Sequence, residues 1–247
     1  MKFLITLVCT AFVIQTAFPQ NRDKFFAFDA SWQNVKMNKA YYLVRVRKNA
    51  EKDFLISTYL AGGPCIMQEK FKDDSGTVRN GNSRYYHSNG YLDSVGNFTN
   101  NLADGQFDYF DLVGRFSSKK WYSNGIMIRD SLFDRQPTDS TEVQKVGTGE
   151  TVATFKGGPN DWMRFLSRNL KSPEGATTSS MNGVVNLIFV VDEKGKVLNP
   201  EIFKSAEYSM DEETLRLIRS SPDWVPASKD GVPIKSYKRQ SVSFQIH

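Results

Sequence analysis

The chain has 247 residues, enough for one large domain or two ordinary ones, and 40% of them are hydrophobic, enough to bury a core. Its net charge of +5 comes from 32 basic residues that are dispersed among 27 acidic ones, with no Lys/Arg block. A basic balance without a basic stripe does not favour nucleic acid as a partner.

Residues 1–20 have the pattern of an export signal. Lys2 is followed by an apolar run over residues 3–14, which is shorter than the roughly 20 residues that a membrane span needs. The run instead suits the apolar core of a secretory signal, and the small residues Thr16 and Ala17 predict cleavage between Ala17 and Gln20. We therefore expect an exported chain. The alternative is an uncleaved signal that anchors the chain and brings it into contact with the membrane.

Cys65 is the single cysteine that follows the predicted signal, so no intramolecular disulfide is expected. Its neighbours Ile66 and Met67 favour a small core residue over a reactive thiol.

One sequence pattern recurs along the first half of the chain: an aromatic residue, a Gly four residues later, and a Phe eight residues after the Gly. The copies are Tyr59-Gly63-Phe71, Tyr86-Gly90-Phe98 and Trp121-Gly125-Phe133, with a degenerate copy at Phe110-Gly114. Asn89-Gly90 and Asn124-Gly125 predict hairpins with type I′ turns. Because a lone hairpin is marginal, we expect the copies to form a continuous antiparallel meander from about Phe25 to Phe133, with the aromatic residues mainly in its core.

The repeat resembles the MORN-like modules of bacterial envelope proteins. The matching segments are residues 85–90 (YYHSNG), 96–98 (GNF), 104–107 (DGQF) and 121–125 (WYSNG). This resemblance implies a scaffold or docking surface over residues 21–135.

Residues 136–150 are polar and lack periodicity, which predicts a linker. Gly147-Thr148-Gly149 is not a dinucleotide fingerprint, because Val152 stands where a third Gly is required.

The elements after the linker alternate between helix and strand. Trp162, Phe165, Leu166 and Leu170 share one helical face, so a helix is predicted that begins at Pro159 or Asn160. Residues 183–192 (GVVNLIFVVD) predict a buried strand, and a tight turn at residues 193–195 leads into a second strand, residues 196–204.

A second helix is predicted to begin with a capping box formed by Ser209 and Glu212, to bury Leu215 and Ile218, and to end before Pro222. A last strand follows over residues 234–246. The order helix, hairpin, helix, strand predicts a three-stranded antiparallel sheet with two helices on one face. The chain as a whole is therefore predicted to be α+β.

The region 151–247 is similar to the TonB C-terminal domain along its whole length. The similarity is carried by residues 155–158 (FKGG), Trp162, Phe165-Leu166, Asn169-Leu170, Pro173, Gly183-Val184-Val185, Phe189-Val190-Val191-Asp192, Gly195-Lys196-Val197, Lys204-Ser205, Asp211-Glu212-Glu213, Trp224-Val225-Pro226, Gly231-Val232-Pro233 and Val242-Ser243-Phe244. The resemblance implies that a short segment of an outer-membrane receptor binds by strand addition to the sheet.

The resemblance also implies that the last strand, residues 235–246, is the edge that receives the partner. The candidate partner-binding residues are Lys235, Ser236, Tyr237, Lys238, Arg239, Gln240, Ser241, Val242 and Ser243. The alternative is an edge whose basic residues only protect it from indiscriminate pairing.

The chain also departs from a complete TonB protein. The run 3–14 lacks the membrane His that couples TonB to a proton-driven complex, and no Pro-rich spacer is present. Ser172 stands where Tyr is common before Pro173, and Ser241 where Pro is common in the last strand. These departures count against energy coupling but leave partner binding in place.

Residues suited to catalysis are few. His87 and His247 have no metal-ligating neighbour at helical spacing, and no nucleophile elbow or Ser-x-x-Lys occurs. The acidic pairs Asp73-Asp74 and Glu212-Glu213 are assigned to a loop and to a helix's first turn. We expect no enzyme activity, no cofactor and no metal.

The sequence thus predicts an exported periplasmic protein that binds an outer-membrane receptor and assists TonB-type transport. The alternative is a structural or cell-wall-associated interaction protein that has a TonB-like fold without energy coupling. The sequence leaves the identity of the receptor and the oligomeric state open.

Overall fold

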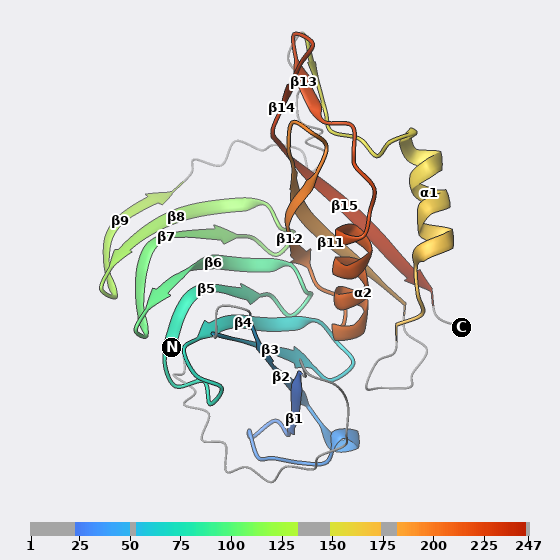
Figure 1. Ribbon diagram of the computed structural model, residues 1–247. Coiled ribbons are helices and arrows are strands. Elements are labelled where there is room, and N and C mark those ends of the chain that lie inside the picture. The colour runs from blue at the N-terminus through green and yellow to red at the C-terminus, as the bar shows by residue number, and fades with distance from the viewer. Residues whose placement is uncertain (1–22, 50–52, 133–148, 174–181, 246–247) are drawn as a thin grey trace. The chain divides into compact units, whose positions relative to one another are not determined.

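The computed structural model describes residues 23–49, 53–132, 149–173 and 182–245 (Figure 1). The chain divides into two compact units, Met1–Asp134 and Arg135–His247. The predicted export signal and all but two residues of the predicted linker lie outside the described residues. No helix in the described ranges is long and apolar enough to cross a membrane.

The N-terminal unit is a single nine-stranded sheet in which every strand pairs with its neighbours in sequence, all of them antiparallel (Figure 1). Its strands are β1 (Lys24–Phe28), β2 (Tyr42–Lys48), β3 (Phe54–Leu60), β4 (Cys65–Phe71), β5 (Arg79–Tyr86), β6 (Leu92–Thr99), β7 (Leu102–Phe110), β8 (Phe116–Ser123) and β9 (Ile126–Leu132), with a short 3-10 helix, η1 (Met37–Lys39), between the first two. The predicted antiparallel meander is confirmed.

The repeat has three structural copies, but they differ from the three predicted ones. The β3–β4, β5–β6 and β7–β8 turns share two backbone hydrogen bonds in equivalent positions, for example His87 N to Tyr91 O and Gly90 N to His87 O. Each of these hairpins also has a register shift directly before the aromatic residue of its copy, which is Tyr59, Tyr86 or Phe110. The third copy is therefore Phe110-Gly114-Tyr122, whose first two residues had been predicted only as a degenerate copy.

The predicted copy Trp121-Gly125-Phe133 was wrong. Gly125 belongs to the β8–β9 turn, which lies at the opposite end of the meander from the β5–β6 and β7–β8 turns. The string Ser-Asn-Gly occurs at both positions and suggested that the two copies are equivalent. The two Asn-Gly pairs, however, form different turns. Asn124 and Gly125 both have positive φ (48° and 81°), which confirms type I′ there.

At Asn89-Gly90 the predicted type I′ turn was wrong. Only Gly90 has positive φ (86°), and the turn is a longer one that leads into a bulge. Asn100 and Asn101 both have positive φ and form a second two-residue turn, between β6 and β7, which was not predicted.

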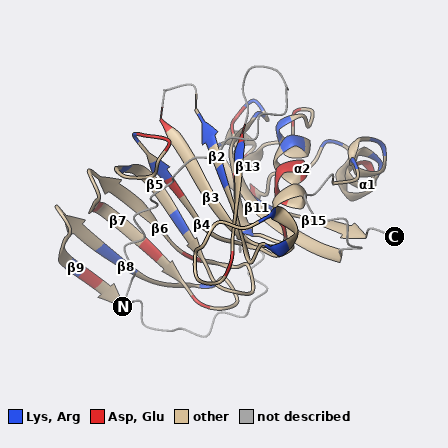
Figure 2. Ribbon diagram, turned by 90° about the horizontal axis from the view of Figure 1, so that it is seen from below, with Lys and Arg blue, Asp and Glu red and all other residues tan. Residues whose placement is uncertain are grey.

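Apolar side chains gather on one face of the first strands. Phe28, Val44, Val46, Ile56 and Phe71 form a buried cluster, with Phe26, Trp32, Tyr42 and Phe54 packed against it. Cys65 is also buried, as predicted for a small core residue. Lys and Arg are interspersed with Asp and Glu along the strands of this sheet (Figure 2), so the basic residues form no continuous stripe on them.

The C-terminal unit contains two helices and two small sheets. Its elements are β10 (Glu150–Thr151), α1 (Gly158–Asn169), β11 (Asn182–Val191), β12 (Val197–Lys204), α2 (Tyr208–Arg219), β13 (Ala227–Lys229), β14 (Val232–Ile234) and β15 (Ser236–Gln245). The main sheet has the order β12-β11-β15, and all its pairs are antiparallel. The predicted three-stranded sheet is confirmed.

The second sheet, β10-β13-β14, was not predicted. Its strands have two or three residues, too few for a periodic pattern. Asp230-Gly231, whose φ angles are 51° and 79°, is the local signal that could have revealed the β13–β14 hairpin. The predicted last strand is correspondingly divided, since β14 ends at Ile234 and β15 begins at Ser236.

Both helices pack on the same face of the main sheet. The core contains every second residue of β11, namely Val185, Leu187, Phe189 and Val191, together with Trp162 from α1 and Met210, Leu217 and Ile218 from α2. Phe165 and Leu166 of α1 pack against the same cluster. The α+β architecture predicted for this region is therefore correct.

The predicted capping box of α2 was wrong. The N-cap residue is Glu207, whose extended backbone precedes the helix and whose carboxylate accepts from Ser209 N at 2.7 Å and from the Ser209 hydroxyl. Ser209 therefore lies inside the first turn. The helix begins two residues earlier than expected because the side chain of Glu207, which is longer than the usual capping residues, satisfies the free N–H group of Ser209.

Candidate functional site

The predicted partner-binding strand lies at an edge of the main sheet. β15 pairs with β11 over ten consecutive residues, from Ser236 opposite Val191 to Gln245 opposite Asn182, without a register shift. Its other side has no pairing strand among the described residues. In an antiparallel strand, alternate residues point their N–H and C=O groups away from the paired neighbour. β15 therefore offers an unbroken backbone edge.

The opposite edge, formed by β12, is irregular. Pro200 lies in the middle of β12 and lacks an N–H, and Asn199 has a positive φ of 48°. The β11–β12 pairing also contains two register shifts. A Pro and bulges discourage further pairing, so β15 is the better strand acceptor of the two.

The side chains of β15 form two rows. Ser236, Lys238 and Gln240 are half-buried and are followed on the same face by the buried Val242 and Phe244. Tyr237, Arg239, Ser241, Ser243 and Gln245 are exposed on the other face. Gln240 thus belongs to the inward row. Lys235 precedes the strand and is exposed.

The inward row of β15 lies beside a close contact between β11 and α2. Gly183, opposite Phe244, lies so near α2 that a Cβ there would be 2.7 Å from Met210 Sδ and 2.9 Å from Ala206 Cβ. A larger residue at position 183 would push α2 away. Val242 and Phe244 belong to the same core and bury the C-terminal half of β15.

All charged side chains of β15 are basic. β15 carries Lys238 and Arg239 and no Asp or Glu. Arg239 lies over the ring of Phe203, with its guanidinium carbon 4.5 Å from the ring centroid. Burial of Lys238 lowers the pKa of its ammonium group.

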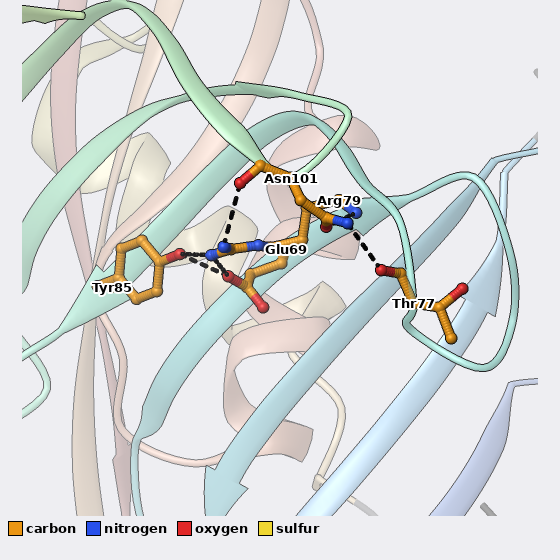
Figure 3. Close-up of polar contacts among 5 residues, drawn as sticks. All are labelled: Glu69, Thr77, Arg79, Tyr85 and Asn101. Atoms are coloured by element: carbon orange, nitrogen blue, oxygen red, sulfur yellow. Dashed lines mark hydrogen bonds and ion pairs between the residues drawn. The ribbon is translucent and has the colours of Figure 1, made fainter. Parts of the chain in front are cut away.

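A polar cluster on the N-terminal sheet joins four segments (Figure 3). Tyr85 donates a hydrogen bond to Glu69 at 2.5 Å, and Arg79 donates to the same carboxylate at 3.3 Å. Asn101 accepts from Arg79 N at 2.7 Å and donates to Thr77 O at 3.0 Å. Burial and the adjacent Glu69 charge raise the pKa of the Tyr85 hydroxyl. These contacts clamp the β4–β5 loop to the β6–β7 turn, which is a structural role.

The residues considered for catalysis also have local contacts. His87 Nε2 lies 3.1 Å from Phe110 O, at the neighbouring turn. Asp73 accepts hydrogen bonds within its own loop, and Glu213 is paired with Arg216. His247 lies outside the described residues. Within the described ranges, no group of His, Cys, Asp and Glu side chains is arranged to hold a metal ion.

The main sheet of the C-terminal unit thus has three strands, two helices on one face and one unbroken edge. The family model for the C-terminal region of the TonB protein of Gram-negative bacteria matches residues 168–246. The match begins in the last turn of α1 and includes β15. No curated protein and no solved structure matches the chain. The resemblance of the N-terminal sheet to MORN-like repeats stays a prediction.

Proposed function

We propose that this chain is an exported envelope protein that binds an outer-membrane receptor by strand addition to β15 and thereby assists TonB-type transport. The observation that carries the proposal is the ten-residue, unshifted edge of β15, which lies inside the region matched by the TonB C-terminal model. The proposed role is binding, without catalysis or a cofactor.

Strand addition follows from the backbone of β15. The free N–H and C=O groups of alternate residues would pair with an extended segment and supply affinity. Side chains of that segment would point alternately toward the inward row (Lys238, Gln240, Val242) and toward the exposed row (Ser241, Ser243). The two rows would therefore supply specificity.

A periplasmic location is proposed from the apolar run of residues 3–14 and from the TonB match. The alternative function, a structural or cell-wall-associated interaction protein without energy coupling, is favoured by one observation. A nine-stranded sheet occupies the residues between the predicted signal and the matched region, where a Pro-rich spacer would be expected.

A cross-linking experiment tests strand addition in the cell. A photoreactive residue is placed at Ser241 or Ser243 on the exposed row of β15, and at Leu198, which is 38% exposed on the β12 edge, as a matched control. We expect the β15 positions to capture an outer-membrane receptor and Leu198 to capture none. Equal capture from both edges, or no receptor captured from β15, would contradict the proposal.

A second experiment separates the two candidate functions. Cell fractionation followed by N-terminal sequencing shows whether residues 1–20 remain on the chain. An anchored chain that is captured by a receptor supports the transport role. A cleaved chain whose β15 cross-links only to other envelope components supports the structural role.

A further inference from the structure

Lys238 occupies an unusual position on the proposed acceptor strand. Its side chain belongs to the inward row of β15, and its direct neighbour across the sheet is Phe189, which is 1% exposed. The next inward residues of β15 toward the C-terminus, after Gln240, are the buried Val242 and Phe244. The positively charged side chain of Lys238 therefore lies where the hydrophobic core reaches the open edge of the sheet.

The described part of the chain supplies no counter-charge to this cation. Some other basic residues of the C-terminal unit form ion pairs, for example Lys196 with Asp223 at 2.7 Å and Lys229 with Glu150 at 3.3 Å. Lys238 has no such ion pair with any described residue, and β15 contains no carboxylate. Lys235 also has no ion pair within the described ranges, but it is exposed, so water solvates its ammonium group. Lys238 is half-buried and loses part of that solvation.

An added strand would bring a side chain to the ammonium group. Neighbouring strands lie about 4.8 Å apart, and directly opposed residues have Cβ atoms about 4.5–5.5 Å apart on the same face. The residue opposite Lys238 on an added strand would therefore lie on the inward face beside the ammonium group. A carboxylate at that position would form a charge-assisted hydrogen bond with Nζ and offset its desolvation.

We propose that the segment accepted by β15 carries an Asp or Glu side chain facing Lys238, and that this pair fixes the register of the added strand. The inference rests on the proposed function, since it requires strand addition at β15. It names the chemistry of the partner: an extended acidic segment. A one-residue slip would turn the carboxylate to the opposite face, away from Lys238.

A competing explanation is that Lys238 only protects the edge from self-pairing. The two explanations differ in one measurable quantity. Protection requires a charge but no matching residue on a partner. Recognition requires that the effect of Lys238 on binding depends on the partner's carboxylate.

Selection from a random peptide library on the immobilised full chain provides the probe. Selected peptides are first tested for cross-linking to a cysteine introduced at Ser243, which locates them at the β15 edge. Peptides that cross-link are then compared for Asp and Glu content at each position. We expect one position to be enriched in acid on the native chain and to lose that enrichment on Lys238→Gln.

Binding constants then test the pairing. Replacing the enriched acid of a selected peptide with Gln or Asn should weaken binding to the native chain about 10-fold, as expected for a hydrogen bond between charged groups. The same replacement should change binding to Lys238→Gln less than about 2-fold. Lys235→Gln is the matched control and should keep the full effect, and Lys238→Arg should retain most of it.

The outcomes distinguish this inference from the proposed function. If no selected peptide cross-links at Ser243, strand addition at β15 itself fails. If peptides cross-link there without acid enrichment, or if the loss on replacing the acid is the same in Lys238→Gln, strand addition stands and the proposed acid–Lys238 pair is overturned. Circular dichroism of each variant checks that it has folded.

Discussion

The ring of Phe107 on β7 lies directly over the backbone of Gly96 on β6. A Cβ at position 96 would sit 2.3 Å from Cδ1 of that ring, far inside van der Waals contact. The ring cannot move aside freely, because Phe98 and Tyr122 pack against it with centroids 5.5 and 5.0 Å away. Position 96 therefore admits only Gly.

Gly96→Ala should destabilise the N-terminal unit by roughly 1–3 kcal/mol, the usual range for overpacking a core site. Urea unfolding measures the change. In the double variant Gly96→Ala/Phe107→Ala the clash is absent, so the combined loss should be smaller than the sum of the two single losses. Additive losses would show that the ring does not restrict position 96.

Asp211 on α2 is buried, and this burial, together with the charges of Glu207 and Glu212, raises its pKa to about 8 despite hydrogen bonds from Ser205 and Ala206. Its folded pKa lies above its unfolded value, so its contribution is fully present below about pH 4 and is lost as pH rises toward 8. Stability of the C-terminal unit should fall in that range, with a slope of up to about 1.4 kcal/mol per pH unit.

Asp211→Asn cannot ionise and should flatten that pH dependence. The variant should match the native chain at about pH 4 and exceed it in stability at about pH 8. Urea unfolding across this range, followed by tryptophan fluorescence, measures the difference. Glu193→Gln, in the exposed β11–β12 turn, is the control and should leave the slope unchanged. If the stability of Asp211→Asn had the same pH dependence as that of the native chain, the raised pKa of Asp211 would not be its cause.

Asp73 organises the β4–β5 loop. Partial burial would raise the pKa of its carboxylate, but hydrogen bonds from Ser75, Thr77 and Val78 outweigh burial and lower it to about 2. The stabilisation is therefore present above about pH 4 and is lost as pH falls toward 2.

Asp73→Asn should cost about 1–2 kcal/mol at pH 7, because a charged acceptor of several hydrogen bonds is lost. The loss should shrink at about pH 2, where about half of the native carboxylate is protonated. Unfolding experiments at the two pH values measure this. Asp74→Asn, which removes only an exposed ion pair with Lys24, should change stability by less than about 1 kcal/mol.

Lys238→Ile should make the chain self-associate. The substitution removes a half-buried ammonium group, so the free energy of unfolding should stay equal or rise. It also removes an inward charge from an unbroken strand edge, and such charges oppose edge-to-edge pairing. Analytical ultracentrifugation should detect dimers or larger species. Lys235→Ile, outside the strand, should remain at the native association state; similar association by both variants would point to general hydrophobicity.

The sequence predicted most of the secondary structure from local patterns. The apolar run of β11 identified a strand, and the spacing of Trp162, Phe165 and Leu166 identified α1. Misassignments occurred where local strings were ambiguous. Ser-Asn-Gly occurs in two different turns, and Ser209 resembles a capping residue although Glu207 performs that role.

The candidate site was predictable only in part. The sequence identified β15 as a strand, but only the order β12-β11-β15 shows that its outer side has no pairing strand among the residues that the structure describes. The irregularity of β12, which singles out β15 as the better acceptor, depends on Asn199 and Pro200 together with the register of β11 against β12.

The sequence alone determined that the chain contains a meander followed by a small α+β unit, because strand alternation, helical spacing and turn residues act within a few neighbours. The tertiary structure decided which repeats are equivalent, which edge is free and how deeply Lys238 is buried. These properties depend on residues distant in sequence, such as Phe107 over Gly96 and Phe189 opposite Lys238. Burial and pairing are set by such distant contacts, which a local pattern does not contain.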